Sequence, residues 1–481
     1  MITLQIDTQE KHRISPYLSM QFMEPLGVCD PSVDAGWDFA EEDWHPALIE
    51  KVRELAPTMV RFGGCFASYY HWREAVGSYR DRIPMINYCW GGLYANHVGT
   101  HEVVDFCRRV GAEPLMVVNM ESDGRMHWAH PKNGTDRLGT AQEAAEWVRY
   151  CNDPDDHLRR AHGVPTPYGI RYWQIGNETS YDARGYSVDQ CVDATRRFAA
   201  AMRRADPTIQ LIGWGDKSKT DDSWCRRMSE TEGIDLIAFH HHFGSGLPDS
   251  PLHGTAYRED REKTWEHLMH AHRSMDTHIR RMREDCGGRR LAMTEGHFTL
   301  PGRSRCEVLS SWAAGVAYAR CHNVIMRHSD ILEIATMADF FGTAWQVNAI
   351  LIPNNQPNRT PYLQPVGEVM RLFRRAQGER AAEVTCDDSA VDVTASRSGN
   401  TIYLHLANTD MHDARALTLD VGGCPILSAQ MTYIAAPPET EITSDHPTCF
   451  AEQSCVIEGG RLILPAAAVA TVSIEIGEPV R

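Results

Sequence analysis

The apolar run IRYWQI (Ile170–Ile175) and the two segments that follow it decide the fold. Its β-branched and aromatic residues are typical of a buried strand. The segment SVDQCVDATRRFAAAMRRAD (187–206) then repeats apolar residues at helical spacing, and QLIGW (Gln210–Trp214) is strand-like again. This order of strand, helix and strand predicts a β/α unit whose strands belong to one parallel sheet.

The same alternation extends in both directions, from about residue 17 to residue 379. Eight strands connected by helices predict a closed (β/α)8 barrel, an α/β fold of the TIM-barrel type. An open doubly wound sheet is the alternative, but it would normally carry a glycine-rich phosphate loop after its first strand, and QFMEPLG (21–27) is not one. The predicted strands are Tyr17–Met23, Thr58–Phe62, Pro114–Asn119, Ile170–Ile175, Gln210–Trp214, Leu236–His240, Arg290–Thr294 and Ile331–Ala335.

Helical spacing of apolar residues marks the segments between these strands. Two of the segments are long, at 264–284 and 307–328, and each is predicted to form one helix. The other predicted helices span residues 45–55, 100–111, 140–151, 187–206 and 365–379.

The pattern changes after about residue 380. Short alternating segments such as NTIYLHLANTD (400–410) and AVATVSIEI (468–476) are separated by turn-forming residues. They predict an all-β sandwich. We therefore predict a barrel domain at 17–379 and a sandwich domain at 380–481, which the N-terminal strand in residues 1–16 is expected to join.

Composition narrows the class of function. The chain has 481 residues, of which 42% are hydrophobic and 23% are charged, so it can bury a large core. Its 48 Lys and Arg against 64 Asp and Glu give a net charge of −16, which argues against nucleic acid or an anionic membrane as a partner. The N-terminus does not resemble a secretory signal. The 14 cysteines, none in a CxxC pair, then predict reduced thiols and a cytoplasmic location.

Polar residues follow most of the predicted barrel strands. Catalytic groups of a (β/α)8 barrel lie at the carboxyl ends of its strands, so we expect these side chains to meet at one rim. The candidates are Glu24, Arg61, Asn119, Asn177, Glu178, His240, His242 and Glu295.

Glu178 and Glu295 end the predicted fourth and seventh strands. Cleavage of a glycosidic bond needs two carboxyl groups, one to protonate the leaving oxygen and one to attack the anomeric carbon, and in retaining enzymes they stand about 5 Å apart. We expect Glu178 to be the general acid/base, with a pKa raised by the charge of Glu295. Glu295 is then the nucleophile, and Arg61 is expected to keep it ionised.

These motifs resemble glycoside hydrolase family 51, the α-L-arabinofuranosidases. ISPYLSMQFMEPLG (14–27) is similar to the opening strand of that family, with Glu24 as its substrate-binding glutamate. YWQIGNE (172–178) resembles the acid/base motif and implies a sugar contact for Asn177, and LAMTEGHF (291–298) resembles the nucleophile motif. The resemblance runs almost from end to end and implies a retaining exo-acting hydrolase of terminal arabinofuranosyl groups, without a cofactor or metal. It also implies a homo-oligomer, commonly a hexamer.

Three positions depart from the family pattern. Cys65 stands where the family commonly has Asn, His242 where it has Tyr, and Trp345 where it has Gln. The chemistry is expected to be unchanged, but the identity of the sugar is in doubt, because a site built for particular hydroxyls discriminates through them. Trp90 and Trp345 are the expected stacking platforms for the sugar.

Other interpretations remain open. A retaining glycosidase for galactofuranose, D-arabinofuranose or xylose would suit the altered positions. A metal-dependent barrel hydrolase could use His240 and His242, because strand alternation aims both inward while His241 points outward. A non-catalytic carbohydrate-binding relative is disfavoured by the presence of both Glu178 and Glu295.

Overall fold

The computed structural model describes residues 2–122, 138–181, 187–217, 223–299, 305–354 and 360–478. Its centre is an eight-stranded sheet in the order β13-β12-β11-β10-β9-β8-β5-β2. The two ends of this order meet, because Tyr17 forms a parallel bridge with Ile334 and the N–H of Met20 donates to the carbonyl of Ala335 at 3.0 Å. The sheet therefore curls into a barrel, and the predicted (β/α)8 fold with a β-sandwich is confirmed.

The barrel strands follow the predicted ones closely. Two of them run further than predicted, to Phe243 and Phe298, and the extensions bring His241, His242 and Glu295 onto paired strands at the rim. The strands are β2 (Met20–Met23), β5 (Met59–Phe62), β8 (Glu113–Val118), β9 (Tyr172–Ile175), β10 (Gln210–Trp214), β11 (Leu236–Phe243), β12 (Arg290–Phe298) and β13 (Leu332–Ile334).

Helices surround the barrel, and local signals set their ends. The Ser187 hydroxyl accepts from the N–H of Gln190, whose side chain accepts from Ser187 in return, so a capping box starts α6. Gly111 ends α3 in a left-handed conformation, with φ 76°. The helices are α1 (Ser32–Gly36), α2 (Pro46–Leu55), α3 (Thr100–Val110), α4 (Ala141–Asn152), α5 (His157–Ala161), α6 (Val188–Ala205), α7 (Ser223–Ser229), α8 (Arg261–His270), α9 (His272–Asp285), α10 (Trp312–Arg327) and α11 (Pro365–Arg375).

Two predicted helices are corrected. The segment 264–284 is not one helix but the pair α8 and α9, because the N–H of Ala271 bonds to the carbonyl of Leu268, three residues back, and the regular ladder is interrupted there. In the segment 307–328 a 3-10 turn at Glu307–Ser310 precedes α10, since Ser311 is extended. The short helix α7 was not predicted.

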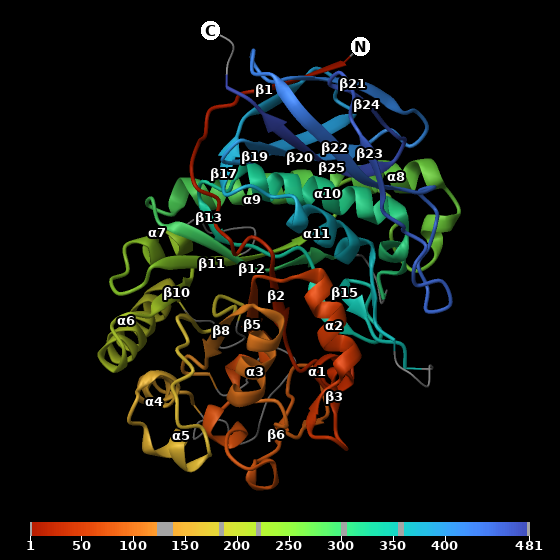
Figure 1. Cartoon of the computed structure of the whole chain (residues 1–481). Helices are drawn as coiled ribbons and strands as arrows, with labels where there is room; N and C mark the ends of the chain where they lie inside the picture. The colour runs from red at the N-terminus through yellow and green to blue at the C-terminus, as the bar shows by residue number, and fades with distance from the viewer. Residues whose placement is uncertain are drawn as a thin grey trace.

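The C-terminal strands form two sheets above the barrel (Figure 1). The strand β1 (Ile2–Ile6) lies in one of them, antiparallel to β18 and parallel to β21. Helix α10 packs beneath the other sheet, and Arg320, Asn323 and Arg327 all donate to the Asp392 carboxylate across this contact. The sheets are β18 (Val384–Cys386), β1, β21 (Arg415–Asp420) and β24 (Arg461–Leu464), and β17 (Arg380–Ala382), β19 (Val391–Ser398), β20 (Thr401–Asn408), β25 (Ala468–Ile476), β22 (Ile426–Ala435) and β23 (Gln453–Val456). The domain division at residue 379 stays a prediction.

Small sheets border the carboxyl end of the barrel. Trp90 lies between β6 and β7, and Trp345 lies between β14 and β15. Among the described residues, no helix combines the length and the apolar character that crossing a bilayer requires. The strands of the small sheets are β3 (Trp37–Asp38), β4 (Asp43–Trp44), β6 (Met85–Ile86), β7 (Leu93–Tyr94), β14 (Asp339–Gly342), β15 (Asn348–Leu351) and β16 (Tyr362–Leu363).

Candidate active site

Arg61 organises the carboxyl end of the barrel. It is the third residue of β5, and its side chain is fully buried. The guanidinium donates to the carboxylate of Glu295 at 2.9 Å, to the side-chain oxygen of Asn177 at 2.5 Å and to that of Gln174 at 3.1 Å. One cation therefore ties β5 to β9, to the turn that follows β9 and to β12. A buried charge of this kind is stable only when it is paired and fully hydrogen-bonded.

Glu178 and Glu295 face each other across this end of the barrel. The backbone turns sharply after β9, because Gly176 and Glu178 both have positive φ, of 74° and 47°. Such a conformation is strained for a glutamate and is common at functional sites. One carboxylate oxygen of Glu178 lies within 4.8 Å of one of Glu295. This separation matches that of the two carboxyl groups in retaining glycosidases.

The two carboxyl groups have different surroundings. Burial, followed by the charge of Asp216, raises the pKa of Glu178 to about 7, although Arg61 opposes the rise. The sequence-based expectation was that Glu295 would raise this pKa, and it is corrected in that respect: removal from water dominates. Glu295 instead forms an ion pair with Arg61. The environments favour a proton on Glu178 near neutral pH.

The histidines on β11 alternate in direction. The Nδ1 of His240 lies 2.9 Å from Glu178 and 3.5 Å from Glu295, while its Nε2 lies 3.0 Å from the hydroxyl of Thr294. Burial lowers the pKa of His240 to about 3, so the ring is neutral and touches both carboxylates. His241 points away, toward His278 and Ser274 on α9. His242 points back toward the two carboxylates, as strand alternation requires.

Glu24 joins the site to the tryptophans on its border. Its carboxylate accepts from the indole N–H of Trp90 at 2.8 Å and from the backbone of Phe66 at 3.3 Å. Burial and then the charge of Glu295 raise the pKa of Glu24 well above its usual range. The ring of Trp345 meets that of Trp90 edge to face at 5.6 Å. The structure therefore brings the two predicted stacking residues together.

Cys65 also lies in this group. It starts a 3-10 turn after β5, and its Sγ is 4.0 Å from Glu178 Oε2. A hydrogen bond with Cys89, followed by burial, raises the pKa of Cys65 well above the usual value for a thiol. The group is therefore a neutral thiol beside the protonatable carboxyl. Gly64 precedes it because a Cβ there would lie 2.1 Å from the Glu24 carboxylate.

Two buried amides present unused donors. The side-chain oxygen of Asn119 accepts from the N–H of Ser122, and that of Asn177 accepts from Arg61. The amide nitrogens of both side chains are buried and have no partner among the described residues. An unpaired buried donor costs about 1–3 kcal/mol, so a bound hydroxyl that accepts from it would recover that free energy.

Several residues that the sequence analysis missed support the site. Gln174 and Thr294 are buried polar side chains within apolar strands, and this contrast is a signal that the sequence does contain. Asp30 gave no such signal. Its carboxylate accepts from the backbone N–H groups of Thr343, Ala344 and Trp345 and from the side chain of Asn348. It thereby holds the loop that carries the Trp345 ring.

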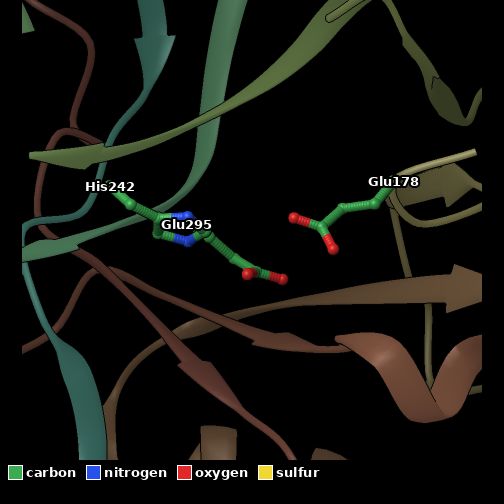
Figure 2. A group of neighbouring side chains, drawn as sticks. All are labelled: Glu178, His242 and Glu295. Carbon is green, nitrogen blue, oxygen red and sulfur yellow. The ribbon is translucent and has the colours of Figure 1, made fainter. Parts of the chain in front are cut away.

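One group of three side chains has ligand types that also suit a metal ion. Ligand atoms of Glu178, His242 and Glu295 all lie within 4.8 Å of one another (Figure 2). The surroundings do not favour a dication. Glu295 is already paired with the Arg61 cation, and His240 already occupies an oxygen of Glu178. A metal at this place would face the repulsion of the buried guanidinium.

Comparison with known proteins gives a consistent family relationship. The family model described as the alpha-L-arabinofuranosidase 1 domain matches residues 51–261. An alpha-L-arabinofuranosidase C of Emericella nidulans is 31% identical over 44% of this chain and 40% of its own length. An intracellular exo-alpha-L-arabinofuranosidase of Bacteroides ovatus is 23% identical over 98% of this chain and 95% of its own length. The chain thus aligns with about two fifths of the Emericella relative but with nearly all of the Bacteroides one.

Solved structures share the whole architecture. The GH51 arabinofuranosidase of Xanthomonas axonopodis pv. citri superposes with a TM-score of 0.81 at 21% identity, over 99% of this chain and 100% of that one. An alpha-L-arabinofuranosidase of Thermotoga maritima, solved as an arabinose complex, gives a TM-score of 0.77 at 22% identity over the same shares. At these identities the likeness establishes the fold.

We predict that the protein functions without a metal ion at the group formed by Glu178, His242 and Glu295, because Arg61 already supplies the positive charge there. Elemental analysis of the purified protein should find far less than one equivalent of zinc or another transition metal, and EDTA should leave turnover unchanged. Stoichiometric metal, or loss of turnover with EDTA that a single metal reverses, would make the metal-dependent hydrolase the better interpretation.

Proposed function

We propose that this chain, which belongs to glycoside hydrolase family 51, removes terminal α-L-arabinofuranosyl groups from oligosaccharides with retention of configuration. The observation that carries the proposal is the pair Glu178 and Glu295, with carboxylate oxygens within 4.8 Å of each other, of which Glu295 is paired with Arg61 and Glu178 has a raised pKa. The names of the relatives supply the sugar and the exo-acting mode.

In this proposal Glu178 is the general acid/base and Glu295 the nucleophile. The Glu295 carboxylate attacks the anomeric carbon while Glu178 gives its proton to the departing oxygen, which leaves a covalent glycosyl ester on Glu295. Glu178, now ionised, takes a proton from water, and the water oxygen displaces Glu295 from the anomeric carbon. The neutral His240 contacts both carboxylates and holds them in place without adding a charge.

The remaining predicted residues are assigned to sugar binding. We propose that the free amide donors of Asn119 and Asn177 bind sugar hydroxyls and that Glu24 accepts from another. Trp90 and Trp345 form an apolar wall on one side. Two further side chains lie next to the carboxylates in this proposed pocket. The thiol of Cys65 is 4.0 Å from the Glu178 carboxylate, and His242 lies close to both carboxylates.

Location and assembly are extensions of the same proposal. The names of the Bacteroides ovatus and Acetivibrio thermocellus relatives describe intracellular enzymes, and we propose a cytoplasmic location for this chain as well. The homo-oligomer is proposed on the family resemblance, and the domains at 17–379 and 380–481 are proposed on the change of sequence pattern near residue 380. No cofactor is part of the proposal.

The sugar assignment is tested with aryl glycosides. We expect turnover of α-L-arabinofuranoside above β-D-galactofuranoside, α-D-arabinofuranoside and β-D-xylopyranoside. Cys65→Asn, His242→Tyr and Trp345→Gln should each change the ratios of kcat/KM, since one altered hydroxyl contact is worth about 1–3 kcal/mol, or roughly five- to 150-fold. His270→Tyr is the matched control, because His270 lies on α8, away from the carboxylates, and bonds to the carbonyl of Glu266 in its own helix. If the α-L-arabinofuranoside is not hydrolysed while one of the other glycosides is, the assigned sugar is wrong and the hydrolysed sugar takes its place.

Removal of the nucleophile should abolish turnover. We expect Glu295→Ala to lower kcat by on the order of 10³-fold or more, because the covalent step has no carboxylate to form the ester. Added azide should not restore the retained product, and any azide product should have inverted configuration, as NMR of the product shows directly. Glu113→Ala, at the opposite end of a barrel strand, serves as the control. Substantial activity in Glu295→Ala would remove Glu295 from this role.

Removal of the acid should depend on the leaving group. Glu178→Ala should slow natural oligosaccharides by about 10²–10⁴-fold and activated aryl glycosides much less, because a good leaving group needs little protonation. In the unaltered enzyme, kcat/KM should fall as pH rises through about 7, where Glu178 loses its proton. This falling limb should be absent from Glu178→Ala. Equal losses on both substrate classes would contradict the assignment.

A further inference from the structure

A cavity adjoins the carboxylate pair on the side of Glu178. It is a groove of about 610 Å³ that extends from His240 and Tyr181 to helix α9. His240 contacts the Glu178 carboxylate, and the backbone N–H of Tyr181 donates to the Glu178 carbonyl, so the groove begins at the proposed acid/base. The acid protonates the departing oxygen, and the leaving part of the substrate therefore lies on this side.

The charge of this groove is opposite to that of the protein. Acidic residues outnumber basic ones in the chain by 64 to 48, yet none of the described residues that line the groove is Asp or Glu. Burial lowers the pKa of the lining residue His241 to about 3, so its imidazole is neutral. The positive charge at neutral pH comes from Arg273 and Arg281.

These two arginines differ in their partners. Arg281 donates to the buried carboxylate of Asp216 at 3.2 Å, so its charge is already balanced. Arg273 is exposed to the groove, and its guanidinium has no hydrogen bond or ion pair with any residue in the described parts of the chain. Arg273, Thr277 and Arg281 recur every fourth residue of α9 and therefore share the face that lines the groove. Arg273 thus presents an unused, bidentate donor to whatever occupies the groove.

We infer that the groove receives a leaving group that carries a carboxylate, such as a uronic acid unit of an acidic oligosaccharide, and that Arg273 binds this carboxylate. The planar guanidinium fits a carboxylate with two parallel hydrogen bonds. Among the described lining residues no carboxylate repels such a substrate, and the carboxylate of Asp216 behind them is paired with Arg281. The inference rests on the proposed glycosidase activity and specifies which substrates are preferred.

A pair of substrates that differ only in charge tests the inference. One is an α-L-arabinofuranosyl methyl uronoside, and the other is its methyl ester, with the same sugars and linkage. We expect kcat/KM to favour the acid by about three- to tenfold, which is the range for one charge-assisted contact at an open site. The preference should shrink at high salt. In Arg273→Gln the ratio of acid to ester should fall to about one.

Arg280→Gln is the matched control. Arg280 is an exposed arginine of the same helix that pairs with Asp276 and lines a different cavity, so its loss should leave the ratio as in the unaltered enzyme. Equal kcat/KM for acid and ester, or a preference that survives in Arg273→Gln, would overturn the inference.

Saturation-transfer NMR with the methyl uronoside alone gives a readout without hydrolysis. If no arabinofuranoside is cleaved but the methyl uronoside binds in a way that depends on Arg273, the proposed function fails and the carboxylate site in the groove stands. If Arg273→Gln binds the methyl uronoside as well as the unaltered protein does, the carboxylate site is overturned.

Discussion

The active end of the barrel depends on one buried cation. The Arg61 guanidinium holds Glu295, Asn177 and Gln174 together, and these groups come from strands far apart in the sequence. A charge with no exposure to water must be matched by partners at short distance, and each partner is constrained in turn by the arginine. The position of Glu295 and the turn that carries Glu178 are therefore coupled through a side chain that itself takes no part in bond cleavage.

The same burial separates the roles of the two glutamates. Glu178 contacts a thiol at 4.0 Å and a neutral imidazole at 2.9 Å, and burial raises its pKa to about 7. Glu295 lies against the cation. Two chemically identical side chains thus have different surroundings, because Glu295 is paired directly with the Arg61 cation whereas burial dominates at Glu178.

The periphery of the site combines rigid support with altered chemistry. Asp30 fixes the backbone of the loop that carries Trp345. Asn87 fixes the loop that carries Trp90, because its side-chain oxygen accepts from the backbone N–H of Trp90 at 3.0 Å. The walls of the pocket are therefore held from outside it. Within this frame, the thiol of Cys65 has a lower hydrogen-bonding capacity than an amide. The imidazole of His242 differs in shape from a phenol.

The sequence by itself determined the barrel, the sandwich and the positions of Glu178 after β9 and Glu295 on β12, because apolar periodicity is a local property that survives without coordinates. It also indicated the inward direction of His240 and His242.

The sequence did not give the break at Ala271 between α8 and α9, where helical propensity is high on both sides and only the hydrogen-bond geometry separates two helices. The tertiary structure alone decided why the pKa of Glu178 is raised and that Asp30 anchors the Trp345 loop. It also decided which amides have no partner among the described residues, and that Arg273 faces a groove whose described lining holds no carboxylate. Burial and pairing between residues distant in the chain are set by packing, and no spacing in the sequence encodes them directly.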